Sequence, residues 1–341
     1  MKGSLATIIS LFIAVLVGVA AASAQSTASV QTQSNVVYAV HDGVSLYGDF
    51  YLPTGAGPHP AMLFIHGGGF RAGSKAGYGT TWGPYLAERG YVVFAIDYRL
   101  ATANQTTWPQ ALLDCKAALQ YLRGNAAMLG IAPDRIGVGG DSAGASLAAL
   151  LGVTQDASAF ANKYPKDSYA SVSTRVKVDV PIYGVHDMIA WERFTAPASN
   201  AGPAPLELFF GGPPDQVPGR YFAASPLSYI RESAKSLGDV AMPNAATRTA
   251  WFLAWGMVDH VVPPNGQSVV FAQALRDAGA TVTAVPVPGV DHFWFTASAL
   301  TGKQGAPSCR DAAPPARIVC DGATPNDFIA PQLVEFLAHN L

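Results

Sequence analysis

The stretch from residue 136 to residue 151 constrains the fold more than any other part of the chain. Residues 136–138 are an apolar run typical of a short buried strand, and residues 145–151 are a run of helix formers. Between them lies Gly-Asp-Ser-Ala-Gly at 140–144, which places Ser142 between two glycines. A serine on a tight, strained turn leaves no room for larger side chains beside it. The order strand, sharp turn, helix predicts a hydroxyl that projects from the carboxyl end of a sheet. The alternative is an ordinary glycine-rich turn.

Strands and helices alternate along most of the chain, after an expected hairpin around residues 41–43. This alternation predicts βαβ units, and therefore an α/β fold with a mostly parallel central sheet and helices on both of its faces. The expected strands are 36–40, 44–52, 61–65, 91–96, 135–138, 178–183, 249–255 and 281–287, and the expected helices are 79–89, 109–123, 145–151, 264–278, 293–300 and 331–341.

Residues 36–341 form one expected domain, because no long polar linker separates the predicted strands. Residues 187–248 differ from the rest, since proline, glycine and aromatic residues dominate there and only short helical pieces are expected, near Leu206 and Tyr221. We expect this segment to be a small loop-rich insertion that covers the edge of the sheet.

The charge content of the chain is low and balanced. Of 341 residues, 13% are charged, and 21 Lys and Arg against 23 Asp and Glu give a formal net charge of −2. Because the sequence contains no basic run, it gives no reason to expect a nucleic-acid partner.

The first residues are typical of a signal peptide at 1–24. Lys2 is followed by an apolar core at 5–22, and Ala-Ser-Ala at 22–24 is a cleavage signal before Gln25. The alternative is an uncleaved membrane anchor, but the apolar core is short and the cleavage site is well formed. We therefore expect a secreted or periplasmic protein with no stable membrane insertion after cleavage, and a flexible N-terminus at 25–35.

The three cysteines fit an exported protein. Cys309 and Cys320 flank a proline-rich loop, and we expect them to form a disulfide in an oxidising compartment. Cys115 lies on an apolar stripe of helical spacing, so it is expected to be a buried free thiol rather than a nucleophile. No cysteine or histidine spacing suggests a metal site.

Nucleophilic ester cleavage needs a serine, a base, a carboxylate that orients the base, and donors for the oxyanion. Ser142 is the candidate nucleophile, and His292, in a turn after the 281–287 strand, is the candidate base. Asp259 follows the 249–255 strand and is the candidate acid. Asp291 is its rival, although a residue adjacent to His292 in sequence is poorly placed to orient that ring. The order Ser, Asp, His is typical of α/β-hydrolases.

The oxyanion donors are expected from His-Gly-Gly-Gly at 66–69, directly after the 61–65 strand. Backbone amides can converge on an oxyanion only where side chains do not intrude, so Gly68 and Gly69 are the candidates, together with Ala143 at the start of the next helix. His66 is expected to have a structural role. The alternative is a loose glycine-rich loop.

Several aromatic residues near the motif ends or in the insertion are candidates to line an apolar substrate cleft. For each of them the alternative is ordinary core or surface packing. They are Phe70, Trp82, Trp191, Phe293 and Trp294.

Taken with their order, these motifs resemble those of the α/β-hydrolase superfamily, and within it the carboxylesterases of the H-G-G-G class, which include hormone-sensitive-lipase-like and feruloyl-esterase-like enzymes. The resemblance spans residues 36–300 and implies a Ser142–Asp259–His292 triad and no cofactor. The sequence departs from the pattern at 231–248, which looks long, and at the Cys309–Cys320 segment. The motifs that carry the resemblance are His66–Phe70, Asp97–Leu100, Asp134–Ile136, Gly140–Gly144, Gly211–Pro214, Ala224–Leu227, Asp259 with Val262 and Pro263, and Pro288-Gly289 before His292.

We therefore expect an exported serine carboxylesterase for short-chain or aromatic esters, either small molecules or polymer-linked groups. A serine peptidase or acyltransferase on the same fold is one alternative, which amide turnover would distinguish. A catalytically silent binding protein is another, although such proteins usually lack a triad member.

Overall fold

The computed structural model describes residues 30–161, 163–195, 204–230, 245–312 and 317–341. The expected signal peptide and the residues up to 29 lie outside these ranges, so export stays a prediction. None of the described helices is both long enough and apolar enough to cross a membrane.

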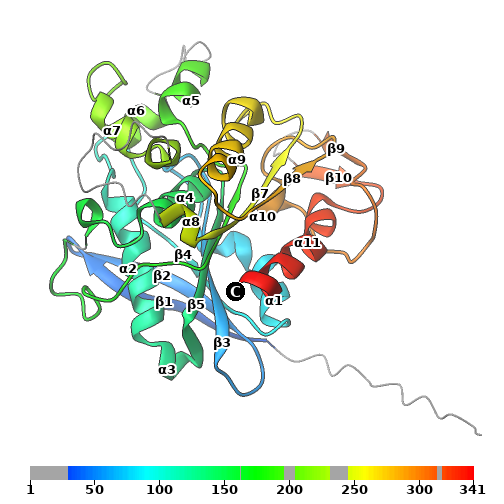
Figure 1. Cartoon of the computed structure of the whole chain (residues 1–341), viewed down its shortest axis with the longest axis horizontal. Helices are drawn as coiled ribbons and strands as arrows, with labels where there is room; N and C mark the ends of the chain where they lie inside the picture. The colour runs from blue at the N-terminus through cyan, green and yellow to red at the C-terminus, as the bar shows by residue number, and fades with distance from the viewer. Residues whose placement is uncertain (1–29, 162, 196–203, 231–244, 313–316) are drawn as a thin grey trace, which may run out of the picture.

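An eight-stranded sheet in the order β1-β2-β4-β3-β5-β6-β7-β8 forms the centre of the molecule (Figure 1). The first two strands form the expected hairpin, β2 is antiparallel to β4, and the remaining pairs are parallel. The inner strands are rich in β-branched and aromatic residues because helices cover both of their faces. The strands are β1 (Gln31–His41), β2 (Val44–Leu52), β3 (His59–Ile65), β4 (Val92–Ile96), β5 (Ile131–Asp141), β6 (Val178–Ile182), β7 (Ala250–Gly256) and β8 (Val282–Val287).

The strand register brings the carboxyl ends of the parallel strands into line. Ile65 at the end of β3 pairs with Gly140 in β5, and Asp141 at the end of β5 pairs with Ile182 in β6. At the other side of the sheet, Gly256 at the end of β7 pairs with Val287 at the end of β8. Loops that follow these strands therefore leave the sheet at one edge, where their side chains can meet.

Helices pack on both faces of the sheet, as expected. Trp251 and Phe252 are successive residues of β7, so their side chains point to opposite faces. Trp251 contacts Phe271 in α9, whereas Phe252 contacts Phe336 in α11. The larger helices are α1 (Trp82–Ala87), α2 (Gln110–Gly124), α4 (Ala143–Thr154), α9 (Ser268–Asp277) and α11 (Pro325–Asn340), with short helices at Lys75–Tyr78, at α3 (Ala126–Leu129) and at α10 (Trp294–Ala297).

The N-terminal strand begins earlier than the sequence predicts. Residues 31–35, expected in a flexible terminus, belong to β1, where Gln31 pairs with Leu52 and Gln33 with Phe50. That prediction is wrong for these residues because backbone pairing to β2 orders them. Their side chains are exposed, so no hydrophobic alternation marks the strand.

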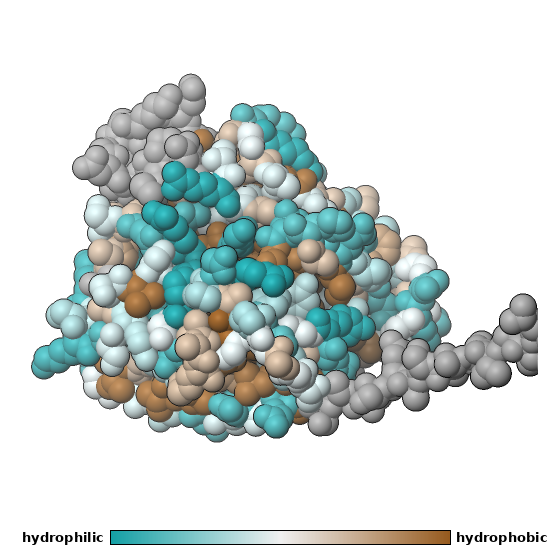
Figure 2. All heavy atoms as spheres, turned by 60° about the horizontal axis from the view of Figure 1, so that its bottom comes forward, coloured by the Kyte–Doolittle hydropathy of each residue, from teal (hydrophilic) through white to brown (hydrophobic). Residues whose placement is uncertain are grey.

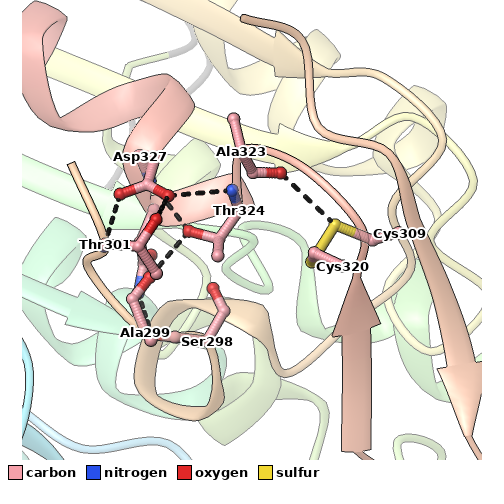
Figure 3. The surroundings of a disulfide bond; sticks show 9 residues. Ser298, Ala299, Thr301, Cys309, Cys320, Ala323, Thr324 and Asp327 are labelled. Carbon is pink, nitrogen blue, oxygen red and sulfur yellow. Dashed lines mark hydrogen bonds between the residues drawn. A yellow bond between two sulfur atoms is a disulfide. The ribbon is translucent and has the colours of Figure 1, made fainter. Parts of the chain in front are cut away.

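The C-terminal helix also begins earlier than expected, at Pro325 instead of residue 331. Thr324 caps it, since its hydroxyl accepts a hydrogen bond from Asp327 N and the Asp327 carboxylate accepts one from Thr324 N. The same carboxylate accepts hydrogen bonds from Thr301 N and Oγ1 (Figure 3). The cap therefore ties the start of α11 to the segment after α10, and Pro331 is accommodated inside the helix.

Cys309 and Cys320 form the expected disulfide, with Cα atoms 4.1 Å apart (Figure 3). They are the paired end residues of a two-stranded hairpin made of β9 (Cys309–Ala312) and β10 (Arg317–Cys320), where the sequence predicted only a loop. Cys115 is a buried free cysteine, and burial raises the pKa of its thiol well above the ordinary value. This thiol therefore stays protonated and unreactive, as expected.

The described part of the 187–248 insertion lies between β6 and β7 and contains α5 (Met188–Thr195), α6 (Pro205–Phe210), α7 (Pro218–Ala223) and α8 (Ala245–Arg248). Three of these helices, α5, α6 and α7, gather at one end of the molecule, at the upper left of Figure 1. Residues 196–203 and 231–244 of the insertion lie outside the described residues.

The surface carries polar and apolar residues side by side, in keeping with the low charge content of the chain. On the face that Figure 2 shows, polar and apolar residues are intermixed, and the apolar ones lie in small groups. Scattered exposed apolar side chains of this kind are normal for a folded protein.

A buried polar network connects the hairpin to α2. The imidazole of His41, at the end of β1, has no exposed surface, with Nδ1 at 2.7 Å from Asp114 Oδ1 and Nε2 at 2.9 Å from Asp167 Oδ2. The Arg99 guanidinium donates two hydrogen bonds to Asp114, and the Arg99 backbone N–H donates a third. The Tyr164 ring stacks on the imidazole with ring centroids 3.6 Å apart. Burial lowers the pKa of His41, but the hydrogen bonds to the two carboxylates outweigh burial and the net shift is upward.

The raised pKa of His41 predicts a pH-dependent contribution to stability. The folded protein holds this proton at pH values where the unfolded chain, with an imidazole pKa of about 6.5, has released it. The contribution is therefore fully present below about pH 6.5 and is lost as the pH rises through the folded pKa. We expect the difference in unfolding free energy between wild type and His41→Gln, measured by urea denaturation, to shrink from pH 6 to pH 9. A difference that stays constant or widens would contradict the charged state assigned to His41.

Candidate active site

Ser142 occupies the turn between β5 and α4, as the sequence predicts. Its backbone has φ 52° and ψ −120°, a conformation that residues other than glycine rarely adopt. Ser142 N donates to Ile182 O at 3.0 Å, and Ser142 O accepts from Ser146 N at 3.1 Å. These bonds to β6 and to the first turn of α4 hold the serine in a strained position at the carboxyl edge of the sheet.

The two glycines beside Ser142 are required by close backbone contacts. A Cβ atom on Gly144 would lie 2.0 Å from Ile65 O at the end of β3. A Cβ atom on Gly140 would lie 2.6 Å from Ile65 O and from the Gly144 carbonyl. The turn therefore packs directly against the neighbouring strand, and neither position tolerates a side chain.

A line of two hydrogen bonds joins Ser142, His292 and Asp259. Ser142 Oγ and His292 Nε2 are 2.9 Å apart, and His292 Nδ1 donates to Asp259 Oδ2 at 2.7 Å. The Asp259 and His292 side chains have no exposed surface. The second carboxylate oxygen of Asp259 accepts hydrogen bonds from Val261 N and Val262 N, which fix the orientation of the carboxylate. The structure thus brings together the three side chains that the sequence singled out.

Asp291, the rival acid, faces away from the imidazole. Its Oδ1 accepts hydrogen bonds from His260 N and His292 N, both at 2.8 Å, and its Oδ2 accepts one from His260 Nδ1 at 3.0 Å. Burial raises the pKa of Asp291, but the hydrogen bonds from His260 and His292 outweigh it and the net shift is downward. The ionised carboxylate therefore joins the loop after β7 to the loop after β8, which carry Asp259 and His292.

The glycine loop after β3 passes beside the serine. A Cβ atom on Gly67 would lie 3.1 Å from Ser142 Cβ, and Gly68 and Gly69 have φ angles of +117° and +61°. Ala143 is the first residue of α4, and amides in the first turn of a helix have no acceptor within the helix. The glycine loop and the start of α4 therefore meet at Ser142, which is the arrangement expected of an oxyanion site.

Asp141 has a role that the sequence analysis missed. Its carboxylate is buried and accepts hydrogen bonds from Gly67 N at 3.1 Å and from the Tyr78 hydroxyl at 2.7 Å. Burial raises its pKa, and the bonds from Tyr78 and Gly67 partly oppose that rise. Asp141 connects the turn that bears the serine to the glycine loop. The available signal is the position of this acidic residue, directly between Gly140 and the candidate nucleophile.

His66 is structural, in agreement with the expectation. Its Nδ1 donates to Gly67 O at 2.7 Å, and its ring stacks on Tyr98 at 4.5 Å. Burial lowers its pKa, so this imidazole is neutral and helps to shape the glycine loop.

Four of the five aromatic candidates for the substrate cleft belong to the hydrophobic core, and three of these four are at most 1% exposed. Trp82 and Trp294 have no exposed surface and Phe70 is 1% exposed, so the prediction that they line a cleft is wrong. Trp82 Nε1 donates to Phe295 O, and Phe70 stacks on Phe209 of the insertion. Sequence position near a motif does not fix the direction of a side chain, and these three point inward.

The other two aromatic candidates lie at the loops that carry the acid and the base. Trp191 in α5 also belongs to the buried core, at 7% exposed, so the prediction that it lines a cleft is wrong as well. Its Nε1 donates to Val261 O, two residues after Asp259. Phe293 is 48% exposed, and its ring contacts the imidazole of His292. Pro205 of the insertion lies beside the glycine loop, since a Cβ atom on Gly69 would lie 3.7 Å from Pro205 Cβ. This contact and the bond from Trp191 to Val261 place the insertion over the carboxyl edge of the sheet.

Within the part of the chain that the structure describes, no group of three or more His, Cys, Asp or Glu side chains is arranged to hold a metal ion. The described site consists of a hydroxyl, an imidazole, a carboxylate and backbone amides.

Comparison with known proteins shows which family the chain belongs to. The model of the family described as BD-FAE matches residues 48–275. Esterase LipQ of Mycobacterium tuberculosis is 29% identical over 255 residues, which cover 74% of this chain and 54% of LipQ. Esterase LipC of the same organism is 36% identical over 248 residues, which cover 72% of this chain and 56% of LipC.

Among solved structures, a truncated form of a carbohydrate esterase from gut microbiota superposes with a TM-score of 0.62 at 27% identity. The match covers 79% of this chain and 91% of that one. The chain spans about half the length of LipQ and LipC, at 54% and 56% of them. The fold is that of the α/β-hydrolases. Because the family model matches more than half of its length, the chain belongs to the BD-FAE family.

Proposed function

We propose that this protein is an exported serine carboxylesterase. The observation that carries the proposal is the hydrogen-bonded line Asp259–His292–Ser142, with distances of 2.7 Å and 2.9 Å, at the carboxyl edge of the sheet. The geometry matches the roles of acid, base and nucleophile in serine hydrolases. The names of LipQ, LipC and the carbohydrate esterase support ester hydrolysis as the reaction.

The first half of the reaction forms an acyl-enzyme. Ser142 Oγ attacks the ester carbonyl carbon while its proton passes to His292 Nε2, and the Asp259 carboxylate stabilises the imidazolium. The oxyanion of the tetrahedral intermediate accepts hydrogen bonds from the amides of Gly68, Gly69 and Ala143. The intermediate collapses when the carbon–oxygen bond to the alcohol breaks and His292 returns the proton to the departing oxygen.

The second half of the reaction releases the acid. A water molecule gives its proton to His292 Nε2 and attacks the acyl carbon, and the second tetrahedral intermediate expels Ser142 Oγ, which recovers the proton. The substrates that we propose are short-chain or aromatic carboxylic esters, free or linked to a polymer. The signal peptide expected at 1–24 and the Cys309–Cys320 disulfide support a secreted or periplasmic location.

Replacement of the nucleophile tests the function directly. Ser142→Ala should lose essentially all esterase activity and retain only the roughly 10³–10⁴-fold acceleration over water that binding and the oxyanion donors provide. Hydrolysis of a soluble aryl ester by the purified proteins measures the effect, and Ser158→Ala, at an exposed serine, is the matched control. Turnover by a folded Ser142→Ala variant within tenfold of wild type would refute the proposal.

The identity of the acid is tested by a pair of variants. Asp259→Asn should lower kcat by roughly 10³–10⁴ with little change in KM, because the imidazole then adopts the wrong tautomer. Asp291→Asn leaves the Asp259–His292 bond in place and disturbs only the link between the two loops, so we expect a loss of about tenfold or less. Steady-state kinetics of both variants on one ester decide the assignment. If Asp291→Asn is the more damaged enzyme, the triad is wrong.

A further inference from the structure

Phe293 has a backbone conformation that does not suit its side chain. It lies between the candidate base and α10, with φ 65° and ψ 0°, in the left-handed region. An aromatic residue is strained there, whereas glycine adopts this conformation without strain. The fold requires a backbone turn at this position, and glycine would form that turn with less strain than phenylalanine.

Contacts on both sides of Phe293 impose the turn. The preceding residue, His292, is held by its bonds to Ser142 and Asp259. Two residues later, Phe295 N donates to the Tyr183 hydroxyl at 3.0 Å. The chain must therefore pass from the loop after β8 into α10 within two residues, which explains the positive φ but not the phenyl group.

Burial does not explain the phenyl group either. Phe293 is 48% exposed, although its neighbours His292 and Trp294 are 3% and 0% exposed. The phenyl ring meets the imidazole of His292 edge to face, with centroids 4.5 Å apart and ring planes at 86°. Tyr183, whose ring centroid is 4.4 Å from that of the imidazole, is completely buried. Of these two aromatic neighbours of His292, Phe293 is the one that solvent, and hence a substrate, can reach.

The chemistry of the proposed reaction assigns a substrate group to this position. His292 Nε2 must protonate the departing alcohol oxygen, so that oxygen lies within hydrogen-bond distance of the imidazole. The first carbon atoms of the alcohol then lie next to the imidazole, within reach of the ring that contacts it. The carbonyl oxygen, in contrast, is directed toward the glycine loop and the start of α4.

We propose that Phe293 forms a wall of the subsite for the alcohol part of the ester and gives the enzyme a preference for aromatic alcohol groups. The preference arises from contact between the exposed phenyl ring and the ring of the leaving group. This inference rests on the proposed esterase function and names the side of the ester on which an aromatic group is recognised.

Three esters separate the alcohol side from the acyl side. Benzyl acetate carries its ring on the alcohol, ethyl phenylacetate carries it on the acyl group, and ethyl acetate has no ring. We expect Phe293→Gly to lower the kcat/KM ratio of benzyl acetate to ethyl acetate by about three- to tenfold. The ratio of ethyl phenylacetate to ethyl acetate should change less than twofold. Phe293→Tyr keeps a ring and should keep the wild-type ratios, as should Met128→Ala, at a 73% exposed residue of α3.

A comparison of two truncations tests the strain. Phe293→Ala removes the ring but leaves a Cβ in the left-handed conformation, whereas Phe293→Gly removes both. We expect the same loss of benzyl preference in the two variants and a higher Tm for Phe293→Gly. An equal loss of kcat/KM on all three esters would overturn the inference and assign Phe293 to positioning of His292. An unchanged benzyl ratio would also overturn it while wild-type hydrolysis still supports the esterase. Failure of the wild type on all three esters would refute the proposed function itself.

Discussion

The structure of the site depends on the close approach of the serine turn to the end of β3. Gly144 lies so near Ile65 O that a Cβ atom would come within 2.0 Å of it. This contact, with the bond from Ser142 N to Ile182 O, holds the turn between two neighbouring strands. Ser142 therefore keeps a conformation that an isolated chain would avoid, and the sheet supplies the free energy that holds it. Every other group of the site is positioned relative to this fixed hydroxyl.

Much of this arrangement is predictable from sequence because the determining patterns are local. Short apolar strands that each end in a motif indicate a parallel sheet, and the carboxyl ends of its strands share one edge. Ser142, Asp259 and His292 each follow a predicted strand, so they can be selected one by one. Asp259 could also be preferred to Asp291, because the acid must reach the imidazole from a separate loop. The structure places all three side chains as that reasoning expects.

The remaining features depend on contacts between distant segments, which have no local signature. The bond from Gly67 N to Asp141 joins residues 74 positions apart, and the exposed first residues of β1 are ordered only by pairing with β2. The inward direction of Trp82 and Trp294 follows from tertiary packing. The early start of α11 has a sequence signal, the capping box at Thr324, which the expected start at Pro331 overlooks.

The central claim is that the fold activates the hydroxyl of Ser142. Its most direct test is to treat the folded protein with a fluorophosphonate, which reacts with activated serines, and to map the adduct by mass spectrometry after proteolysis. We predict one phosphonyl group per chain, on the peptide that contains Ser142, with loss of ester hydrolysis in proportion to labelling. An adduct on another serine, or full labelling of Ser142 with ester hydrolysis intact, would contradict it.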